Sequence, residues 1–281
     1  MNRPLSRLVT SLLLVLAAAC YGPTDLEPSE SCYGDGDARP TFGDPALEAS
    51  VWEALGVAAG TQLTCAQVAY VTDLDASDAG VTSLVGIQNL VNLRYLDVTG
   101  SSLDDLSPLS GLPILQSLFA SSSGIVSLNG LGNLPRLEFL DLSLNSISDI
   151  GPLAGLPSLL YLDLGGNQIS DLGPLGGLTG VQFLYLGDNA VSDIGPLAGL
   201  STLRTLYLDA NQVTDLTALA GLPTLRVVDL TDNVALSDIQ PLLDNGDLGS
   251  GDSVGLRGTA VDCPSVSALR AKGVTVDHGC Q

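Results

Sequence analysis

The sequence has little of what most catalytic sites and nucleic-acid interfaces require. Of its 281 residues only one is a histidine, and 10 lysines and arginines stand against 31 acidic residues, which gives a formal net charge of −21. So acidic a chain is a poor partner for nucleic acids and anionic lipid surfaces. The sequence contains no phosphate-binding loop or dinucleotide fingerprint, and a lone histidine leaves a metal site without a second imidazole. We therefore expect neither an enzyme nor a cofactor or metal.

The amino terminus has the pattern of an export signal. Arg3 and Arg7 precede an apolar run at residues 12–19, too short to remain as a transmembrane helix, which predicts a signal peptide over residues 1–19. The ending "LAAAC" resembles the bacterial lipoprotein signal. That resemblance implies a lipid on Cys20 and attachment to the outer membrane or cell surface, since Tyr21 rather than aspartate follows. Simple cleavage and secretion is the alternative.

Cysteine is scarce and its number is odd, 5 in all. Acylation of Cys20 would leave an even set, Cys32, Cys65, Cys263 and Cys280, in an oxidising compartment. Proximity in the sequence favours the disulfides Cys32–Cys65 and Cys263–Cys280.

What the sequence does contain is a 22-residue period. Within one copy the pattern is L-x-x-L-x-L-x-x-N-x-I-x-D-I-x-P-L-x-x-L, which predicts a short strand, a turn and a tight helical segment. One copy alone cannot bury its leucines, so the copies must stack, each covering the apolar edge of the last. After a degenerate start at Val71, successive copies begin at Leu93, Leu115, Leu137, Leu159, Val181, Leu203 and Leu225.

Two polar series accompany the leucines. The amide series is expected to bond turn backbone groups that water cannot reach, and the aspartate series is expected to cap the helical segments. Ala79, Ser101 and Ser123 stand in the amide position of the early copies, which predicts a less regular amino-terminal end. The amides are Asn145, Asn167, Asn189, Asn211 and Asn233, and the aspartates are Asp149, Asp171, Asp193 and Asp215.

These residues resemble the leucine-rich repeat family, in its 22-residue bacterial, internalin-like type. The resemblance implies an α/β solenoid: a right-handed horseshoe with one parallel β-sheet on its concave face and short helical or 3-10 turns on its convex face. Residues 71–262 hold about eight or nine copies. The last full copy contains insertions, and a ninth strand is expected at "DSVGLRG", with Thr259 in place of the asparagine.

Both ends of the stack need covers. Residues 42–70 are expected to form a helical amino-terminal cap, because Asp44 and Pro45 start a helix that stops at Gly56. Residues 263–281 are expected to form a disulfide-closed carboxy-terminal cap, with a helix that ends at Gly273 and a final strand. Residues 20–41 are an acidic linker rich in Gly, Pro and Ser.

The residues beside the core leucines of each strand should face solvent. Seven of the eleven Phe and Tyr residues (7 Tyr, 4 Phe) occupy these positions, and contiguous exposed aromatics usually mark an interaction site. Aromatic preference for strands, with aspartate as filler, is the alternative interpretation. The predicted site residues are Tyr95, Asp97, Phe119, Phe139, Asp141, Tyr161, Asp163, Phe183, Tyr185, Tyr207 and Asp229.

The pattern therefore predicts a monomeric protein that binds a basic or polar protein or peptide through this aromatic and acidic face. A carbohydrate ligand, or a structural role in the envelope without a ligand, are the alternatives. "GDSVG" at residues 251–255 matches the hydrolase motif G-x-S-x-G, but Ser253 falls on an expected strand and His278 near the tail, so we expect no hydrolase. "DLDASD" at residues 73–78 lacks the glycine and the glutamate of a calcium loop.

Overall fold

The computed structural model describes residues 25–27, 30–32 and 36–280. The expected signal peptide and Cys20 lie outside the described residues, as does part of the linker. None of the helices in the described part is both long and apolar enough to cross a bilayer.

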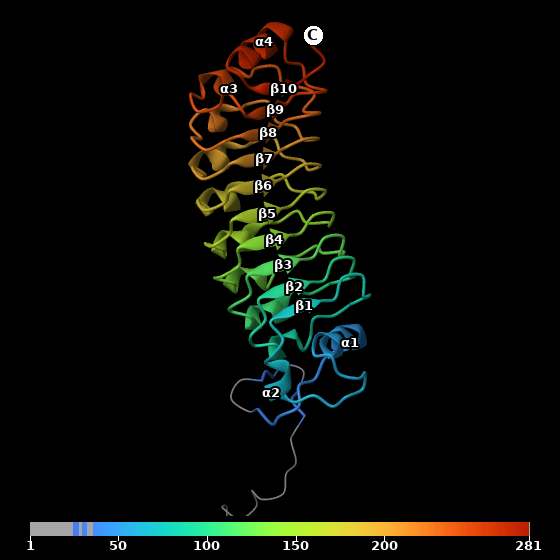
Figure 1. Cartoon of the computed structure of the whole chain (residues 1–281). Coiled ribbons are helices and arrows are strands. Elements are labelled where there is room, and N and C mark those ends of the chain that lie inside the picture. The colour runs from blue at the N-terminus through green and yellow to red at the C-terminus, as the bar shows by residue number, and fades with distance from the viewer. Residues whose placement is uncertain (1–24, 28–29, 33–35, 281) are drawn as a thin grey trace, which may run out of the picture.

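A single parallel sheet runs the length of the molecule, with its ten strands in sequence order (Figure 1). Neighbouring strands pair at the 22-residue step, as when Leu74 aligns with Leu96 and Leu96 with Leu118. These middle residues are fully buried, which confirms the expected solenoid core. The strands are β1 (Asp73–Asp75), β2 (Tyr95–Asp97), β3 (Ser117–Phe119), β4 (Phe139–Asp141), β5 (Tyr161–Asp163), β6 (Phe183–Tyr185), β7 (Thr205–Tyr207), β8 (Val227–Asp229), β9 (Ser253–Gly255) and β10 (Thr275–Asp277).

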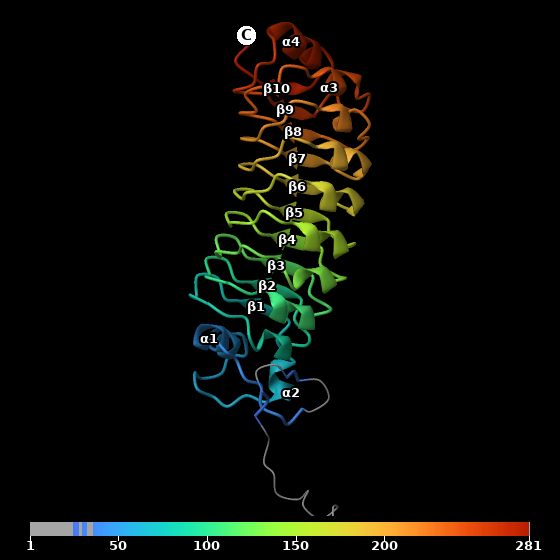
Figure 2. The same cartoon turned by 180° about the vertical axis from the view of Figure 1, so that it is seen from behind.

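Short 3-10 helices stack on the other side of the core (Figure 2). The aspartate series bonds the first turn of these helices from one residue before the expected N-cap position: Ile150 is the N-cap of η4, and Asp149 Oδ1 accepts the N–H of Gly151, the first helical residue, at 2.8 Å. In two early copies the N-cap residue is a glycine with a positive φ, Gly86 or Gly130. Glycine is required there, because a Cβ would overlap the backbone of the preceding segment. The 3-10 helices are η1 (Ile87–Asn89), η2 (Ser107–Gly111), η3 (Leu131–Asn133), η4 (Gly151–Gly155), η5 (Gly173–Gly177), η6 (Gly195–Gly199) and η7 (Thr217–Leu219).

The asparagines form a hydrogen-bonded ladder between copies. Asn211 Oδ1 accepts the N–H of Val191, and its Nδ2 donates to the carbonyl oxygens of Leu186, Leu208 and Asp209 at 2.8–3.2 Å. Each amide thus satisfies backbone groups of its own copy and of the preceding one, as the sequence predicts. The early copies keep the strand register but lack the asparagine. Ser123 replaces it in part, because its Oγ donates to the carbonyls of Val98 and Ser121, whereas the buried Oγ of Ser101 has no partner.

The amino-terminal cap contains helix α1 (Pro45–Ala54) and the short helix α2 (Cys65–Val68). The buried carboxylate of Asp44 accepts the N–H groups of Ala46 and Leu47, and its second oxygen accepts the N–H and hydroxyl of Thr82 in the first repeat. Asp44 therefore starts α1 and also ties it to the solenoid. Leu47 and Val51 of α1 are fully buried.

The disulfide Cys32–Cys65 holds the segment before α1 against α2, with an S–S distance of 2.07 Å. Part of the expected linker also packs on the cap, because Cys65 and Ala66 of α2 donate their N–H groups to the carbonyls of Ala38 and Gly36, and Ala38 is buried.

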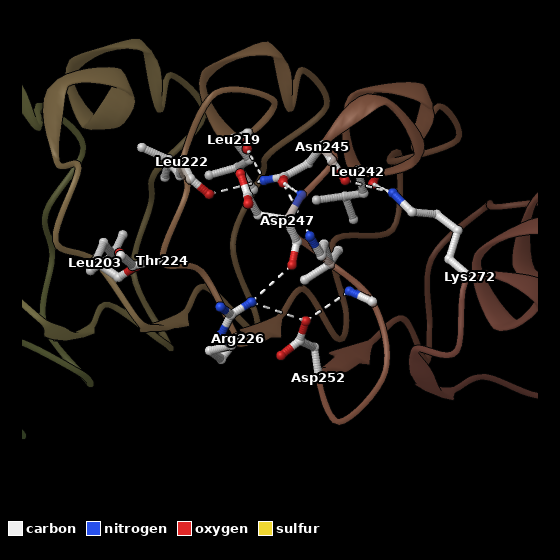
Figure 3. A network of polar contacts seen from close by, with 12 residues as sticks. Leu203, Leu219, Leu222, Thr224, Arg226, Leu242, Asn245, Asp247, Asp252 and Lys272 are labelled. Carbon is white, nitrogen blue, oxygen red and sulfur yellow. Dashed lines mark hydrogen bonds and ion pairs between the residues drawn. The ribbon is translucent and has the colours of Figure 1, made fainter.

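The insertion after β8 changes the step between strands, so that Val227 aligns with Ser253 instead of Gly249. Helix α3 (Gln240–Asp244) takes the place of the 3-10 helix in this copy, and most of the extra residues form the loop after it, organised by Asn245. Its amide donates to the carbonyls of Leu219 and Leu222, and its Oδ1 accepts two loop N–H groups (Figure 3).

The carboxy-terminal cap consists of helix α4 (Cys263–Ala271) and β10, joined by the disulfide Cys263–Cys280, S–S 1.98 Å. Gly273 ends the α4 region with a positive φ, as expected. Arg270 of α4 donates to the carbonyls of Val276 and Cys280, so it bonds the last strand of the sheet from the side.

Candidate binding face

The outer residues of β1–β8 lie on one exposed face of the sheet, which we call the concave face. In each strand the middle residue is buried and the two outer residues are half-buried or exposed. The structure places every predicted site residue on this face: Tyr95, Asp97, Phe119, Phe139, Asp141, Tyr161, Asp163, Phe183, Tyr185, Tyr207 and Asp229.

Most of the aromatic side chains form one cluster, and two form a separate pair. Tyr161 is the centre of the cluster: its ring centroid lies 6.4 Å from that of Phe139, 6.5 Å from Phe183 and 5.3 Å from Tyr185. Tyr207 extends the cluster, stacked 5.1 Å from Tyr185. We call these five residues the ring cluster. The pair is Tyr95 and Phe119, at 5.5 Å.

The aspartates between the core leucines have a structural function that the sequence did not indicate. In Asp97, Asp141, Asp163 and Asp229, one oxygen accepts the backbone N–H two residues further along, each at 2.9 Å. These carboxylates thus fix the turn that follows each strand. The second oxygen of Asp97 also accepts the hydroxyl of Tyr95, at 3.5 Å.

Several carboxyl and phenol groups lie close together at the centre of the concave face. Burial raises the pKa of Asp163, and the nearby charge of Asp141 raises it further. Burial also raises the pKa of Tyr161, with the charge of Asp163 as the next cause, so this phenol stays protonated and can bond Asp163. The rings are therefore neutral surfaces surrounded by negative potential.

Acidic side chains also gather beyond the ring cluster, at β7 and β8. Burial raises the pKa of Asp209, which follows β7, and the neighbouring charges of Asp229, Asp188 and Asp232 raise it further. The repeat spacing predicts all four as an acidic rim of the aromatic face, with Asp229 among the predicted site residues.

An open pocket of about 430 Å³ lies at the opposite end of the face, where α1 meets β1. Glu53 and Ser50 of α1 line one side, and Asp73, Asp75 and Tyr95 line the other. The sequence does not predict this pocket, because its walls come from the cap and from the first two strands. No local motif joins Glu53 to residues this far along the chain.

The two local motifs lie in ordinary structural settings. Ser253 begins β9 instead of occupying a turn between strand and helix, and Nδ1 of His278 accepts the N–H of Cys280. In the "DLDASD" segment, Oδ1 of Asp75 accepts the N–H and hydroxyl of Ser77. The described part of the chain contains no group of three or more acidic, histidine or cysteine side chains placed to hold a metal ion.

The fold and the repeated contacts define a leucine-rich repeat protein, and comparisons with known proteins agree. The profile of the family "Leucine Rich repeats (2 copies)" matches residues 135–177, 157–199 and 179–221. The curated proteins contain no significant match.

Solved structures narrow the family. An internalin of Listeria monocytogenes, InlF, is 31% identical over 85% of this chain and 69% of its own, with a TM-score of 0.78. Internalin C2 of the same species is 37% identical over 76% of this chain and 97% of its own, with a TM-score of 0.71. The functional domain of InlJ, at 18% identity over 84% of this chain and 60% of its own, shares the fold with a TM-score of 0.59. The chain belongs to the internalin-like leucine-rich repeat family.

Proposed function

We propose that this protein binds a protein or peptide partner through the concave face. The observation that carries the proposal is the ring cluster, five contacting aromatic side chains on an exposed sheet face whose core is made of leucine and valine. Phe139 and Phe183 are 41% and 38% exposed, an arrangement that a folded monomer has no need of. Leucine-rich repeat solenoids present this kind of extended surface to partners.

The place of action that we propose is the outside of a bacterial cell. Two disulfides favour an oxidising compartment. The lipoprotein-like ending at Cys20 supports attachment to the outer membrane or cell surface through a lipid, with residues 20–24 as the start of a tether.

The test is capture from native envelope and culture medium with the purified mature protein. We expect wild type to retain a partner that the double variant Tyr161→Ala, Tyr185→Ala loses, because the two substitutions remove the centre of the ring cluster. Tyr70→Ala is the matched control, since Tyr70 lies outside the concave face and is 82% exposed.

The identity of the retained material separates the alternatives. A retained protein supports the proposal, and a retained glycan replaces it with carbohydrate stacking on the same rings. Equal recovery by wild type and the double variant would contradict the proposal and favour a structural role in the envelope.

A further inference from the structure

The concave face is acidic at both ends and aromatic between them. At one end Glu53, Asp73 and Asp75 surround the pocket beside α1. At the other end Asp209 and its acidic neighbours follow the ring cluster at β7 and β8. Counting strands from β1 to β8 at about 4.8 Å each places the two ends roughly 30 Å apart.

The pocket beside α1 can hold one long side chain with a positive charge. Its volume of about 430 Å³ lies in the range of small-ligand sites. Asp73 uses one oxygen to accept the hydroxyl of Thr72, and Asp75 uses one for Ser77, which leaves the second oxygen of each for a donor. The ring of Tyr95 forms a wall, and its face is suited to a guanidinium or ammonium group.

The charges of the pocket keep it ready for a cation at neutral pH. Hydrogen bonds from the side chain and backbone of Ser77 lower the pKa of Asp75, so that carboxyl stays ionised. Burial and the charges of Asp97, Asp75 and Asp73 raise the pKa of Tyr95, so its ring stays neutral.

The chain does not neutralise either end itself. In the described residues the ion pairs are Arg39–Asp25, Arg226–Asp252 and Arg257–Asp277. None of them involves the pocket carboxylates or the acidic group around Asp209. A partner can therefore supply the missing positive charges without displacing an internal one.

We propose that the partner contacts the face with an apolar stretch that carries arginine or lysine at both ends, one of these side chains entering the pocket beside α1. This inference rests on the proposed function and specifies its partner. In an extended peptide, about ten residues would cover the span at roughly 3.3 Å per residue.

The probe is a synthetic, fluorescein-labelled peptide of twelve residues, with two arginines at each end and neutral apolar residues between. Binding is measured by fluorescence anisotropy. The pocket variant is Glu53→Gln, Asp73→Asn, Asp75→Asn, whose amides keep the internal hydrogen bonds of the two aspartates. The control variant Asp149→Asn, Asp171→Asn, Asp193→Asn removes the same charge from exposed helix caps, where asparagine also caps.

We expect the pocket variant to weaken peptide binding about tenfold and the control variant less than twofold, because direct contact outweighs long-range attraction at physiological salt. Replacing the arginines at one peptide end by citrulline should weaken binding to wild type. With the pocket variant, the same replacement at the end that occupies the pocket should have no further effect. Equal losses in the two variants, or no binding of the peptide by wild type, would overturn the inference.

Failure of this inference can be distinguished from failure of the proposed function. If the double variant Tyr161→Ala, Tyr185→Ala loses the envelope partner and the pocket variant retains it, the proposed function holds. The inference that the partner carries cationic ends is then wrong. If the partner is insensitive to the tyrosine changes, the function itself fails. Both variants are checked for an unchanged thermal unfolding midpoint first.

Discussion

The residue before each ladder position adopts the left-handed conformation. Glycine fills it in three copies, but Leu144 and Ala210 have φ values of 55° and 51° there. A side chain with a Cβ is unfavourable in this region, because the Cβ approaches the following carbonyl oxygen. These turns are therefore locally strained, and the packing of neighbouring copies holds them in this conformation.

Ala210→Gly should stabilise the protein by about 1 kcal/mol, because glycine adopts a positive φ without that contact. The measurement is the free energy of unfolding from urea titration. Ala198→Gly is the control, since Ala198 lies in η6 with an ordinary φ and should be neutral or destabilising. Equal effects of the two substitutions would show that position 210 is not strained.

The sequence marks this position only in part. Aspartate and glycine, which tolerate a positive φ, occupy most copies, but serine, leucine and alanine interrupt the pattern. The leucines and asparagines were predictable because each has one repeated task, core packing or the backbone ladder. The repeat spacing places the aspartates of the concave face correctly, but it indicates only a surface charge for them. Their bonds to the following turn depend on backbone geometry that spacing does not show.

At the scale of elements, α3 depends on a residue of the carboxy-terminal cap. Lys272 Nζ donates to the carbonyls of Leu242, Leu243 and Asn245 at 2.6–3.2 Å (Figure 3). These carbonyls lie at the end of a helix, where a positive charge is favourable. The cap thus closes a terminus that the insertion after β8 created.

Lys272→Met should destabilise this end by about 2 kcal/mol, because buried carbonyls lose a charged donor. Hydrogen exchange should quicken at the amides of α3 while those of β4 to β6 stay protected. The comparison is Arg257→Met, which removes a cation from an exposed ion pair with Asp277 and should change stability little. Unaltered exchange in α3 would mean that Lys272 does not hold the helix.

The positions of the helices and strands were predictable from the sequence. The contacts between segments far apart in the chain were not. Helix α1 runs over Pro45–Ala54 and β9 over Ser253–Gly255, as start signals and period predicted. The pocket beside α1 needs Glu53 and Asp73 in one place, which only the packing of the cap on the first strand provides.

At the scale of the whole molecule, the acidic charge gives stability a maximum below neutral pH. The pKa values of Asp163 and Asp209 are raised in the folded protein, so both bind protons at a higher pH than their ordinary 3.8 in the unfolded chain. Lowering the pH from 7 therefore stabilises the fold. Burial alone would raise the pKa of Asp44, but hydrogen bonds from Thr82, Leu47 and Ala46 outweigh it and lower that pKa.

We expect the free energy of unfolding to rise as the pH falls from 7 toward the ordinary carboxyl pKa of 3.8, and to fall below pH 3.8 as Asp44 is protonated and its stabilising bonds are lost. Urea titrations at several pH values measure both the rise in stability above pH 3.8 and the loss of stability below it. Asp209→Asn should reduce the rise in the free energy of unfolding and leave its fall below pH 3.8 unchanged. A monotonic loss of stability from pH 7 downward would contradict this account.

The bonds of Lys272 have a practical consequence as well. It is the only lysine in the sequence, and in the folded protein its ammonium is half-buried and committed to three carbonyls. Apart from the amino terminus, the surface offers no free primary amine. Coupling through amines to a resin or sensor chip would therefore attach the folded protein mainly by its amino terminus, in one orientation and without disturbing the bonds that Lys272 makes.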